Sequence, residues 1–246
     1  MTDERTNFAR PGNIPNEVTI PPRRYPLSPT VPVHIGRSAL APILFMSVMF
    51  TILGVKVGLP LVPSAIFGGV GGVVSLLFHE LGHVRAATHV PSVRPTSVSL
   101  IWAGAATSLE GRYRSGGDQV RVAIAGPQAS FAFAFSLIAV CFLPAPLEVK
   151  EPLLLLALFN IALGVLNLFP AYPLDGYKVA TGLLWSLTGS EGKARKILRR
   201  VGIGWAVVEL PAALLLLVER PLLGSLVLGA ALTLVAQKRL MPRLTR

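Results

Sequence analysis

Residues 64–87 read SAIFGGVGGVVSLLFHELGHVRAA, and this stretch decides how the rest of the chain is interpreted. It is apolar over the length of about 20 residues that a helix needs to cross a bilayer. Its second half holds two histidines and a glutamate, and ionisable side chains are costly in lipid and usually mark functional sites. The sequence therefore predicts a membrane-spanning helix with a functional site near its C-terminal end.

The composition of the whole chain is also typical of a membrane protein. Hydrophobic residues make up 52% of the 246 residues, charged residues make up 14%, and the mean hydropathy is +0.61. A soluble globular domain has about 45 to 50% apolar residues. The net charge of +11 is therefore interpreted first as membrane topology, and we expect no nucleic-acid partner.

Six stretches are long and apolar enough to span a bilayer. With the N-terminus in the cytoplasm, 20 of the 23 Lys and Arg residues lie on the inner side of these spans, in agreement with the positive-inside rule. The sequence thus predicts a multi-pass protein of a bacterial cytoplasmic membrane with both termini cytoplasmic. The six stretches are residues 38–58, 64–87, 120–143, 153–169, 201–218 and 221–237.

The chain is expected to consist of a tail and one membrane domain. Residues 1–37 contain seven prolines and five arginines without a sustained apolar run, which predicts a disordered cytoplasmic tail. Residues 38–246 are predicted to form a single membrane-embedded domain. Near-alternating β-formers at 93–111 indicate a short hairpin or edge strand beside the membrane. The predicted fold is an all-α polytopic membrane protein with about six transmembrane helices, a membrane-edge β-hairpin and a proline-broken fourth helix.

An H-E-x-x-H box lies at His79, Glu80 and His83. Histidines four residues apart differ by about 40° around a helix and by about 6 Å along it, so both imidazoles can reach one ion. Glu80 lies on the flank of that face, which is the general-base position in zinc proteases. The alternatives are a buried polar cluster satisfied by neighbouring helices and a proton or ion relay.

Asp175 is the best candidate for a third ligand, because a catalytic zinc site takes three ligands from the protein. It lies in the segment 167–176, NLFPAYPLDG, where Pro170 and Pro173 are predicted to end the fourth helix and an extended stretch follows. Counting helical rise along the two spans brings His83 and Asp175 to a similar depth near the cytoplasmic edge. The alternative is that Asp175 is the N-cap of a short helix at 174–188.

The H-E-L-G-H box and the downstream N-x-x-P-x-x-P-L-D-G motif together resemble the site-2 protease family of intramembrane zinc metalloproteases. Ala125-Gly126-Pro127 resembles a third element of that family, so the resemblance covers about residues 64–188, the expected catalytic core. The resemblance implies one Zn²⁺ ion bound by His79, His83 and Asp175, with Glu80 as acid and base. It also implies that Asn167 holds the substrate or the developing oxyanion; the alternative for Asn167 is a hydrogen bond between helices.

The chain departs from the family pattern at two places. Many members have Asn three residues after the Pro of A-G-P, whereas this chain has Ser130, and we expect this change to touch no metal ligand. The chain also lacks an inserted PDZ-like or CBS-like module, which implies a compact member of the family.

The predicted function is hydrolysis of membrane-embedded or membrane-delivered peptides near the cytoplasmic face of the bilayer. Because a helical substrate hides its backbone, it must unwind, and the edge at Val98, Leu100 and Trp102 is predicted to receive it as an added strand. Two other classes are kept as alternatives. One is a transport or ion-handling protein that uses the His/Glu/Asp cluster, and the other is a non-catalytic metal-binding scaffold.

Overall fold

The computed structural model describes residues 31–36, 39–56, 58–101 and 104–201. Three of its helices are long and apolar enough to cross a membrane, and a shorter apolar helix precedes them. The predicted span 221–237 and all but the first residue of the predicted span 201–218 lie outside the described residues, as does Trp102. The elements are β1 Val33–Ile35, α1 Leu40–Lys56, α2 Leu61–Ala87, β2 Val93–Ile101, β3 Gly104–Gly111, α3 Gly116–Cys141, α4 Leu147–Asn167 and α5 Asp175–Thr188.

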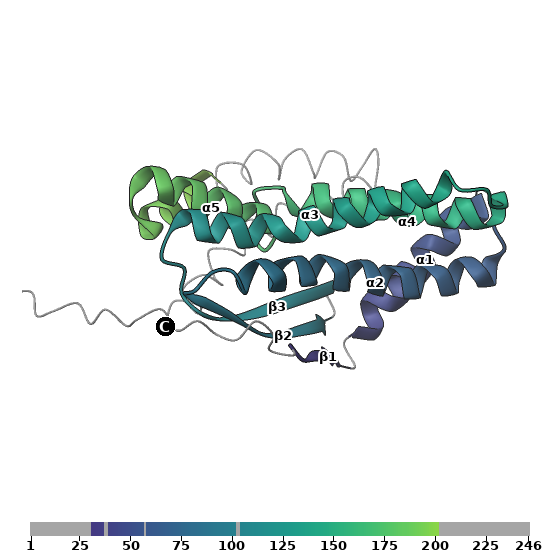
Figure 1. Cartoon of the computed structure of the whole chain (residues 1–246), viewed down its shortest axis with the longest axis horizontal. Coiled ribbons are helices and arrows are strands. Elements are labelled where there is room, and N and C mark those ends of the chain that lie inside the picture. Colours follow the sequence, from purple (N-terminus) through teal and green to yellow (C-terminus); the bar gives the residue numbers. More distant parts are fainter. Residues whose placement is uncertain (1–30, 37–38, 57, 102–103, 202–246) are drawn as a thin grey trace, which may run out of the picture.

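Helix α2 lies in the middle of the molecule (Figure 1). Helices α3, α4 and α5 lie on one side of it and the small sheet lies on the other, while α1 crosses it near its N-terminal end. A Cβ at Gly68 would collide with Phe50 of α1, and one at Gly72 would collide with Met46. On another face of α2, a Cβ at Gly71 would contact Leu156 of α4 at 3.1 Å. Small residues therefore let α2 approach its neighbours closely, as in many membrane helix pairs.

The predicted hairpin at 93–111 is confirmed. Strands β2 and β3 pair antiparallel with an irregularity between Pro95 and Ser97, and β1 pairs parallel with the other edge of β2. The strand β1 falls within the predicted disordered tail, so that prediction is wrong for Val33–Ile35. Residues 1–30 of the predicted tail lie outside the described residues.

The prediction of an exposed edge at Val98 and Leu100 is wrong. Both residues lie on the central strand β2, paired with Val33 and Ile35 of β1. Only 1% of Val98 and 2% of Leu100 is exposed, and Leu100 packs against Leu76 of α2. Because β1 covers one edge of β2 and β3 covers the other, β2 has no free edge over these residues.

The connection between α4 and α5 consists of turns rather than the expected extended stretch. Helix α4 ends at Asn167, before both prolines, and the backbone N–H of Leu168 donates to the carbonyl of Gly164. The peptide bond between Tyr172 and Pro173 is cis. Asp175 is the first residue of α5 and Leu174 occupies the N-cap position, so Asp175 is not the helix cap.

Candidate metal centre

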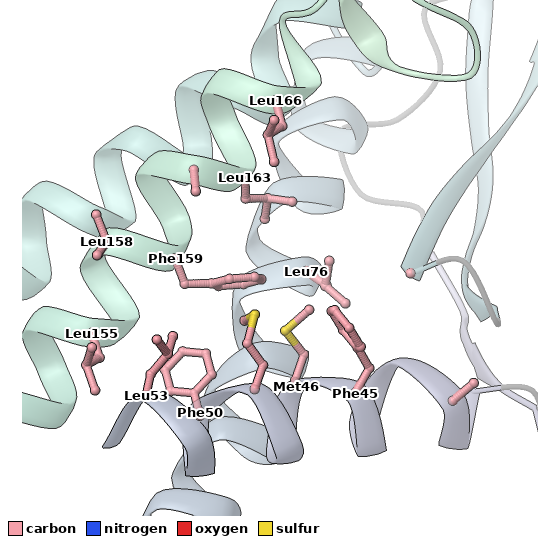
Figure 2. A pocket seen from close by; sticks show the side chains of 14 residues that line it. Phe45, Met46, Phe50, Leu53, Leu76, Leu155, Leu158, Phe159, Leu163 and Leu166 are labelled. Carbon is pink, nitrogen blue, oxygen red and sulfur yellow. The ribbon is translucent and has the colours of Figure 1, made fainter. Parts of the chain in front are cut away.

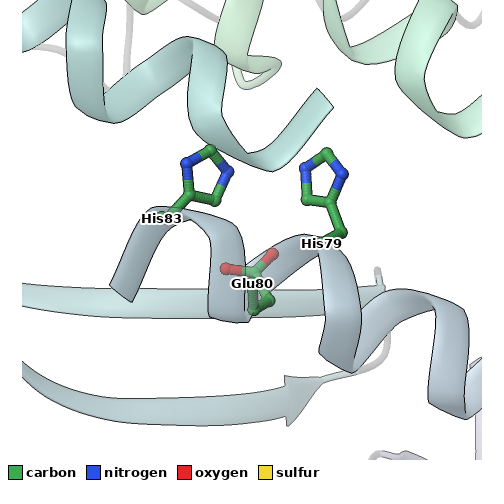
Figure 3. A group of neighbouring side chains, drawn as sticks. All are labelled: His79, Glu80 and His83. Atoms are coloured by element: carbon green, nitrogen blue, oxygen red, sulfur yellow. The ribbon is translucent and has the colours of Figure 1, made fainter. Parts of the chain in front are cut away.

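Helix α2 carries the H-E-x-x-H box within its buried C-terminal half. The imidazoles of His79 and His83 project from α2 towards the neighbouring helix, and Glu80 lies between them on another side of the helix (Figure 3). His79 is 3% exposed and His83 is 5% exposed, and their ring centroids are 5.1 Å apart. The one-turn spacing therefore brings both rings to one place, as the helical geometry predicts.

Asp175 meets both imidazoles from the start of α5. Its Oδ2 atom lies 3.1 Å from Nε2 of His79 and 3.0 Å from Nε2 of His83, and the residue is 5% exposed. Residues separated by more than 90 positions in the sequence thus converge on one point. The structure brings together the three residues that the sequence proposed as metal ligands.

The second oxygen of Asp175 has its own cationic partner. Lys178, one turn further along α5, donates from Nζ to Oδ1 over 3.0 Å. Burial raises the pKa of Asp175, but the hydrogen-bonded imidazoles of His79 and His83 and the charge of Lys178 lower it more, so the pKa lies well below its usual range. Asp175 is therefore ionised, and its Oδ2 atom presents a negative charge to the two imidazoles.

Helix α3 supplies a hydrogen-bond partner for the outer nitrogen of each imidazole. Nδ1 of His83 lies 2.8 Å from the backbone carbonyl of Val122, and Nδ1 of His79 lies 2.8 Å from the hydroxyl of Ser130. Ser130 is completely buried. The expectation that Ser130 touches no ligand candidate is therefore wrong, because its hydroxyl contacts His79 directly.

Two glycines allow α3 to approach α2 at this point. A Cβ at Gly82 of α2 would collide with the carbonyl of Ala125, and a Cβ at Gly126 of α3 would collide with the Nε2 edge of His83. The same Cβ at Gly126 would lie 2.7 Å from Nε2 of His79. Gly126 therefore leaves room in front of the two nitrogen atoms that face Asp175.

Glu80 is held by the sheet. The hydroxyl of Thr107 on β3 donates to Oε2 of Glu80 over 2.6 Å, and Glu80 is 7% exposed. A carboxylate oxygen of Glu80 and one nitrogen of each histidine lie within 4.8 Å of one another. Glu80 is thus near the imidazoles, but Asp175 lies closer to their Nε2 atoms and is the better ligand candidate.

The other predicted site residues have different positions. The side-chain amide of Asn167 donates to the carbonyl of Leu163 on its own helix, and among the described residues no hydrogen bond joins it to His79 or His83. Val98 and Leu100 face α2 from the middle of the sheet. Thr107 and Lys178 were not predicted, because each reaches the site through a contact that no local sequence pattern marks.

An apolar groove of about 760 Å³ lies between α1 and α4, with α2 behind it (Figure 2). Its lining includes Phe45 and Phe50 from α1 and Phe159 from α4. Leu76, one turn before His79, also lines it, together with Gly104 at the start of β3. Apolar surface therefore extends from between the helices to within one turn of the candidate metal centre.

The fold and this site define a membrane protein with a buried metal-binding group built around an H-E-x-x-H helix. Comparison with known proteins shows what the chain is similar to. Residues 144–208 match the model of Peptidase family M50. The structure is similar to the site-2 protease from Methanocaldococcus jannaschii, with a TM-score of 0.56 and 23% sequence identity over 83% of this chain and 89% of that one.

Curated relatives support the same relationship. A provisionally named zinc metalloprotease of Synechocystis is 34% identical over 139 residues, 55% of this chain and 36% of that protein. A zinc metalloprotease of Methanocaldococcus jannaschii is 31% identical over 167 residues, 66% of this chain and 48% of that protein. The chain thus spans less than half the length of these relatives. Taken together, the chain is similar in sequence to zinc metalloproteases and, over residues 144–208, to Peptidase family M50, and it is similar in fold to a site-2 protease.

Proposed function

We propose that the chain is an intramembrane zinc endopeptidase that cleaves membrane-embedded or membrane-delivered peptides near the cytoplasmic face. The observation that carries this proposal is the convergence of Nε2 of His79, Nε2 of His83 and Oδ2 of Asp175 on one buried point. Two imidazoles and a carboxylate are a common ligand set for catalytic zinc. The relatives are named as zinc metalloproteases, which supports the choice of metal and reaction.

The residues present fit a zinc ion. Bonds of about 2.0 to 2.1 Å in a tetrahedral site keep two ligand atoms about 3.3 Å apart. The distances from Asp175 to the two Nε2 atoms, 3.1 and 3.0 Å, are close to this value. All three residues are buried, so water screens little of the charge of the Asp175 carboxylate.

The hydrogen bond of His83 to α3 indicates which of its nitrogen atoms is available to a metal. Because the carbonyl of Val122 can only accept, Nδ1 of His83 must carry a proton. In the neutral ring, Nε2 then presents a lone pair to Oδ2 of Asp175 only 3.0 Å away. Two acceptors at this distance require a cation or a proton between them. A zinc ion supplies that cation and keeps the imidazole neutral.

Each residue of the site then has a chemical role. His79, His83 and Asp175 would hold the zinc ion, which would supply a Lewis acid for the scissile carbonyl and for water. Glu80 accepts the proton of the attacking water and delivers it to the leaving amine. Thr107 holds the Oε2 atom of Glu80, and among the described residues no hydrogen bond occupies Oε1, which is therefore available for this proton. Asn167 is proposed to contact the substrate when the peptide is bound.

The substrate is proposed to pair with β3 rather than β2. The N–H of Val98 donates to Pro32, so the backbone groups of Val98 point towards β1 and away from β3. Thr107, which lies opposite Val98, therefore directs its own N–H and C=O to the outer side of β3, and so does Ala105. Among the described residues, no strand pairs with that side. A peptide added there lies beside Thr107, whose side chain binds Glu80.

The site is proposed to face the cytoplasm of a bacterial cell, with both termini on that side and substrates drawn from the lipid bilayer. The support is the distribution of charge, because the six predicted spans would put 20 of the 23 Lys and Arg residues on the side where α2 ends. The apolar groove that ends at Leu76 and Gly104 supports a substrate that is itself apolar.

The Glu80→Gln variant tests the proposed function. Gln keeps the size of the side chain but cannot take a proton, so cleavage of a single-pass membrane substrate is expected to fall by at least about a hundredfold. Zinc content, measured by atomic absorption, is expected to stay near that of the wild type. As a matched control, Glu110→Gln, on an exposed position of β3, should change neither quantity.

The same experiment separates the alternatives from the proteolytic function. A transport protein or a metal-binding scaffold does not need Glu80 as a base, so the Glu80→Gln variant would keep its main activity. Wild-type protein that binds zinc but cleaves no peptide under any substrate condition would contradict the protease proposal and favour the scaffold.

A further inference from the structure

We propose that Ser130 is a positioning residue for the metal: its hydroxyl holds the imidazole of His79 so that Nε2 faces Asp175. This inference rests on the proposed function, because it assumes that His79 binds a metal ion. The hydroxyl lies 2.8 Å from Nδ1 of His79, and the two residues are 0% and 3% exposed. Ser130 is on α3 and His79 is on α2, so the bond joins the two helices at the site.

The hydroxyl of Ser130 is used differently from most hydroxyls in these helices. A helical Ser or Thr usually donates to the carbonyl four residues earlier. Seven others described here do so, whereas the hydrogen bond of Ser130 reaches His79 across the helix interface. The seven are Thr51, Ser64, Ser75, Ser136, Thr181, Ser186 and Thr188. Ser130 therefore satisfies the outer nitrogen of an imidazole in a position where a purely structural serine would bond to its own helix.

A hydroxyl can both donate and accept a hydrogen bond, so Ser130 can pair with His79 in its metal-free and in its metal-bound tautomer. Without a metal, Nε2 of His79 can donate a proton to Asp175, and Nδ1 then accepts from the Ser130 hydroxyl. With a metal on Nε2, the ring proton must lie on Nδ1, and the Ser130 oxygen accepts it. The carbonyl of Val122 can only accept, so it fixes His83 in the second arrangement alone. Ser130 thus keeps His79 hydrogen-bonded both before and after metal binding.

The positions along α3 match those along α2. Val122, Gly126 and Ser130 are spaced by four residues and so lie on one face of α3. Val122 contacts His83 and Ser130 contacts His79, while Gly126 between them leaves space beside both Nε2 atoms. This face of α3 therefore sets the direction of both imidazoles.

The proposal is tested by measuring zinc affinity on the full chain in detergent micelles, by competition with a chromophoric chelator. Removing the outer partner of a metal-bound histidine typically weakens metal binding by about 10- to 100-fold, and this loss is expected for Ser130→Ala. Ser130→Thr keeps the hydroxyl and is expected to bind zinc within about threefold of the wild type. Ser136→Ala removes an exposed hydroxyl from the same helix, which donates only to Ala132, and should leave the affinity unchanged.

A second measurement distinguishes positioning from a structural role. The rise in Tm on adding zinc should be smaller in Ser130→Ala than in the wild type, whereas a purely structural role lowers the zinc-free and zinc-loaded Tm by equal amounts. If Ser130→Ala does not fold, Ser130→Cys, which keeps the size and is a weak hydrogen-bond partner, should show the same loss. An unchanged affinity in these variants overturns the role of Ser130 and leaves the proposed function intact. A wild-type chain that binds no zinc overturns both.

Discussion

At the scale of single residues, the two oxygen atoms of the Asp175 carboxylate have different partners. Oδ2 of Asp175 faces both imidazoles, while Oδ1 is bound by Lys178. The charge of Lys178 on α5 thereby compensates the charge at Oδ1. The Oδ2 atom faces the two histidines, where a metal ion would bind. A buried carboxylate without such partners would be costly, so the arrangement stabilises a charge that the site needs.

Gly126→Ala is expected to weaken zinc binding through a steric clash with the imidazoles, against a gain in helix propensity. Alanine favours a helix by up to about 1 kcal/mol over glycine, so the propensity term alone stabilises α3. The added Cβ would collide with the Nε2 edge of His83, and we expect zinc affinity to fall by more than about tenfold, at least the loss caused by removing an outer hydrogen-bond partner. Zinc retention after dialysis and the Tm of the zinc-free protein are the two measurements.

Gly117→Ala is the matched control for this variant. It lies on the same helix, and its Cβ would have only Ser115 Oγ nearby, at 3.8 Å. It should keep zinc affinity while gaining the same helix propensity. Equal zinc affinity in the Gly126→Ala and Gly117→Ala proteins would show that the space beside the imidazoles is not needed for the metal.

The sequence alone predicts those site residues whose positions follow from the geometry of a single helix or from the cost of burying a charge. The spacing of His79 and His83 follows from the pitch of one helix, and Asp175 was found because an acidic residue near lipid needs a partner. Ser130, Thr107 and Lys178 could not be assigned in this way. Each contributes through a hydrogen bond whose partner is set by helix packing or by the turn at α5, and a serine or threonine in an apolar stretch has many such options.

At the scale of elements, the sheet differs most from the expectation. The alternating pattern at 93–111 correctly predicts two paired strands, but it carries no information about a third strand. Strand β1 has only three residues and follows a proline-rich segment, so composition favours a tail there. Its pairing with β2 moves the free edge to β3, which is also the strand that carries Thr107 to Glu80.

Ala105→Pro tests whether β3 receives the substrate. Proline is tolerated on an edge strand where the N–H faces outward, so zinc content and Tm should stay near those of the wild type. The substrate would lose one backbone hydrogen bond, worth about 0.5 to 1.5 kcal/mol, so cleavage should fall by about two- to tenfold. Kinetics with a membrane-reconstituted substrate measure this change.

Ala106→Pro provides the contrast for this variant. The N–H of Ala106 points towards Ser99 of β2, so proline at this position removes a hydrogen bond within the sheet. It should lower the Tm as well as cleavage. If Ala105→Pro cleaves at the wild-type rate while Ala106→Pro is destabilised, the outer edge of β3 is not the substrate position.

At the scale of the whole molecule, α2 lies between the layer of helices α3 to α5 and the small sheet (Figure 1). Towards α3 and α5 it presents His79 and His83, and towards the sheet it presents Glu80, which Thr107 holds (Figure 3). The candidate base and the candidate metal ligands therefore lie on the same helix but are positioned by opposite layers. A change in the sheet should alter Glu80 without displacing the histidines, and a change in α3 should do the reverse.

The orientation of the molecule in the membrane is the last prediction. The turn between α3 and α4 lies at the opposite end of the bundle from the basic helical segment at 191–201. Because basic residues concentrate on the cytoplasmic side, the first should face outward and the second inward. Single cysteines in a Cys141→Ser background test this: Ala145→Cys should react with a membrane-impermeant maleimide in intact cells, and Gly192→Cys only after the membrane is opened. Both positions are exposed, so equal labelling of Gly192→Cys before and after opening would reverse the proposed topology and place the metal centre on the outer side.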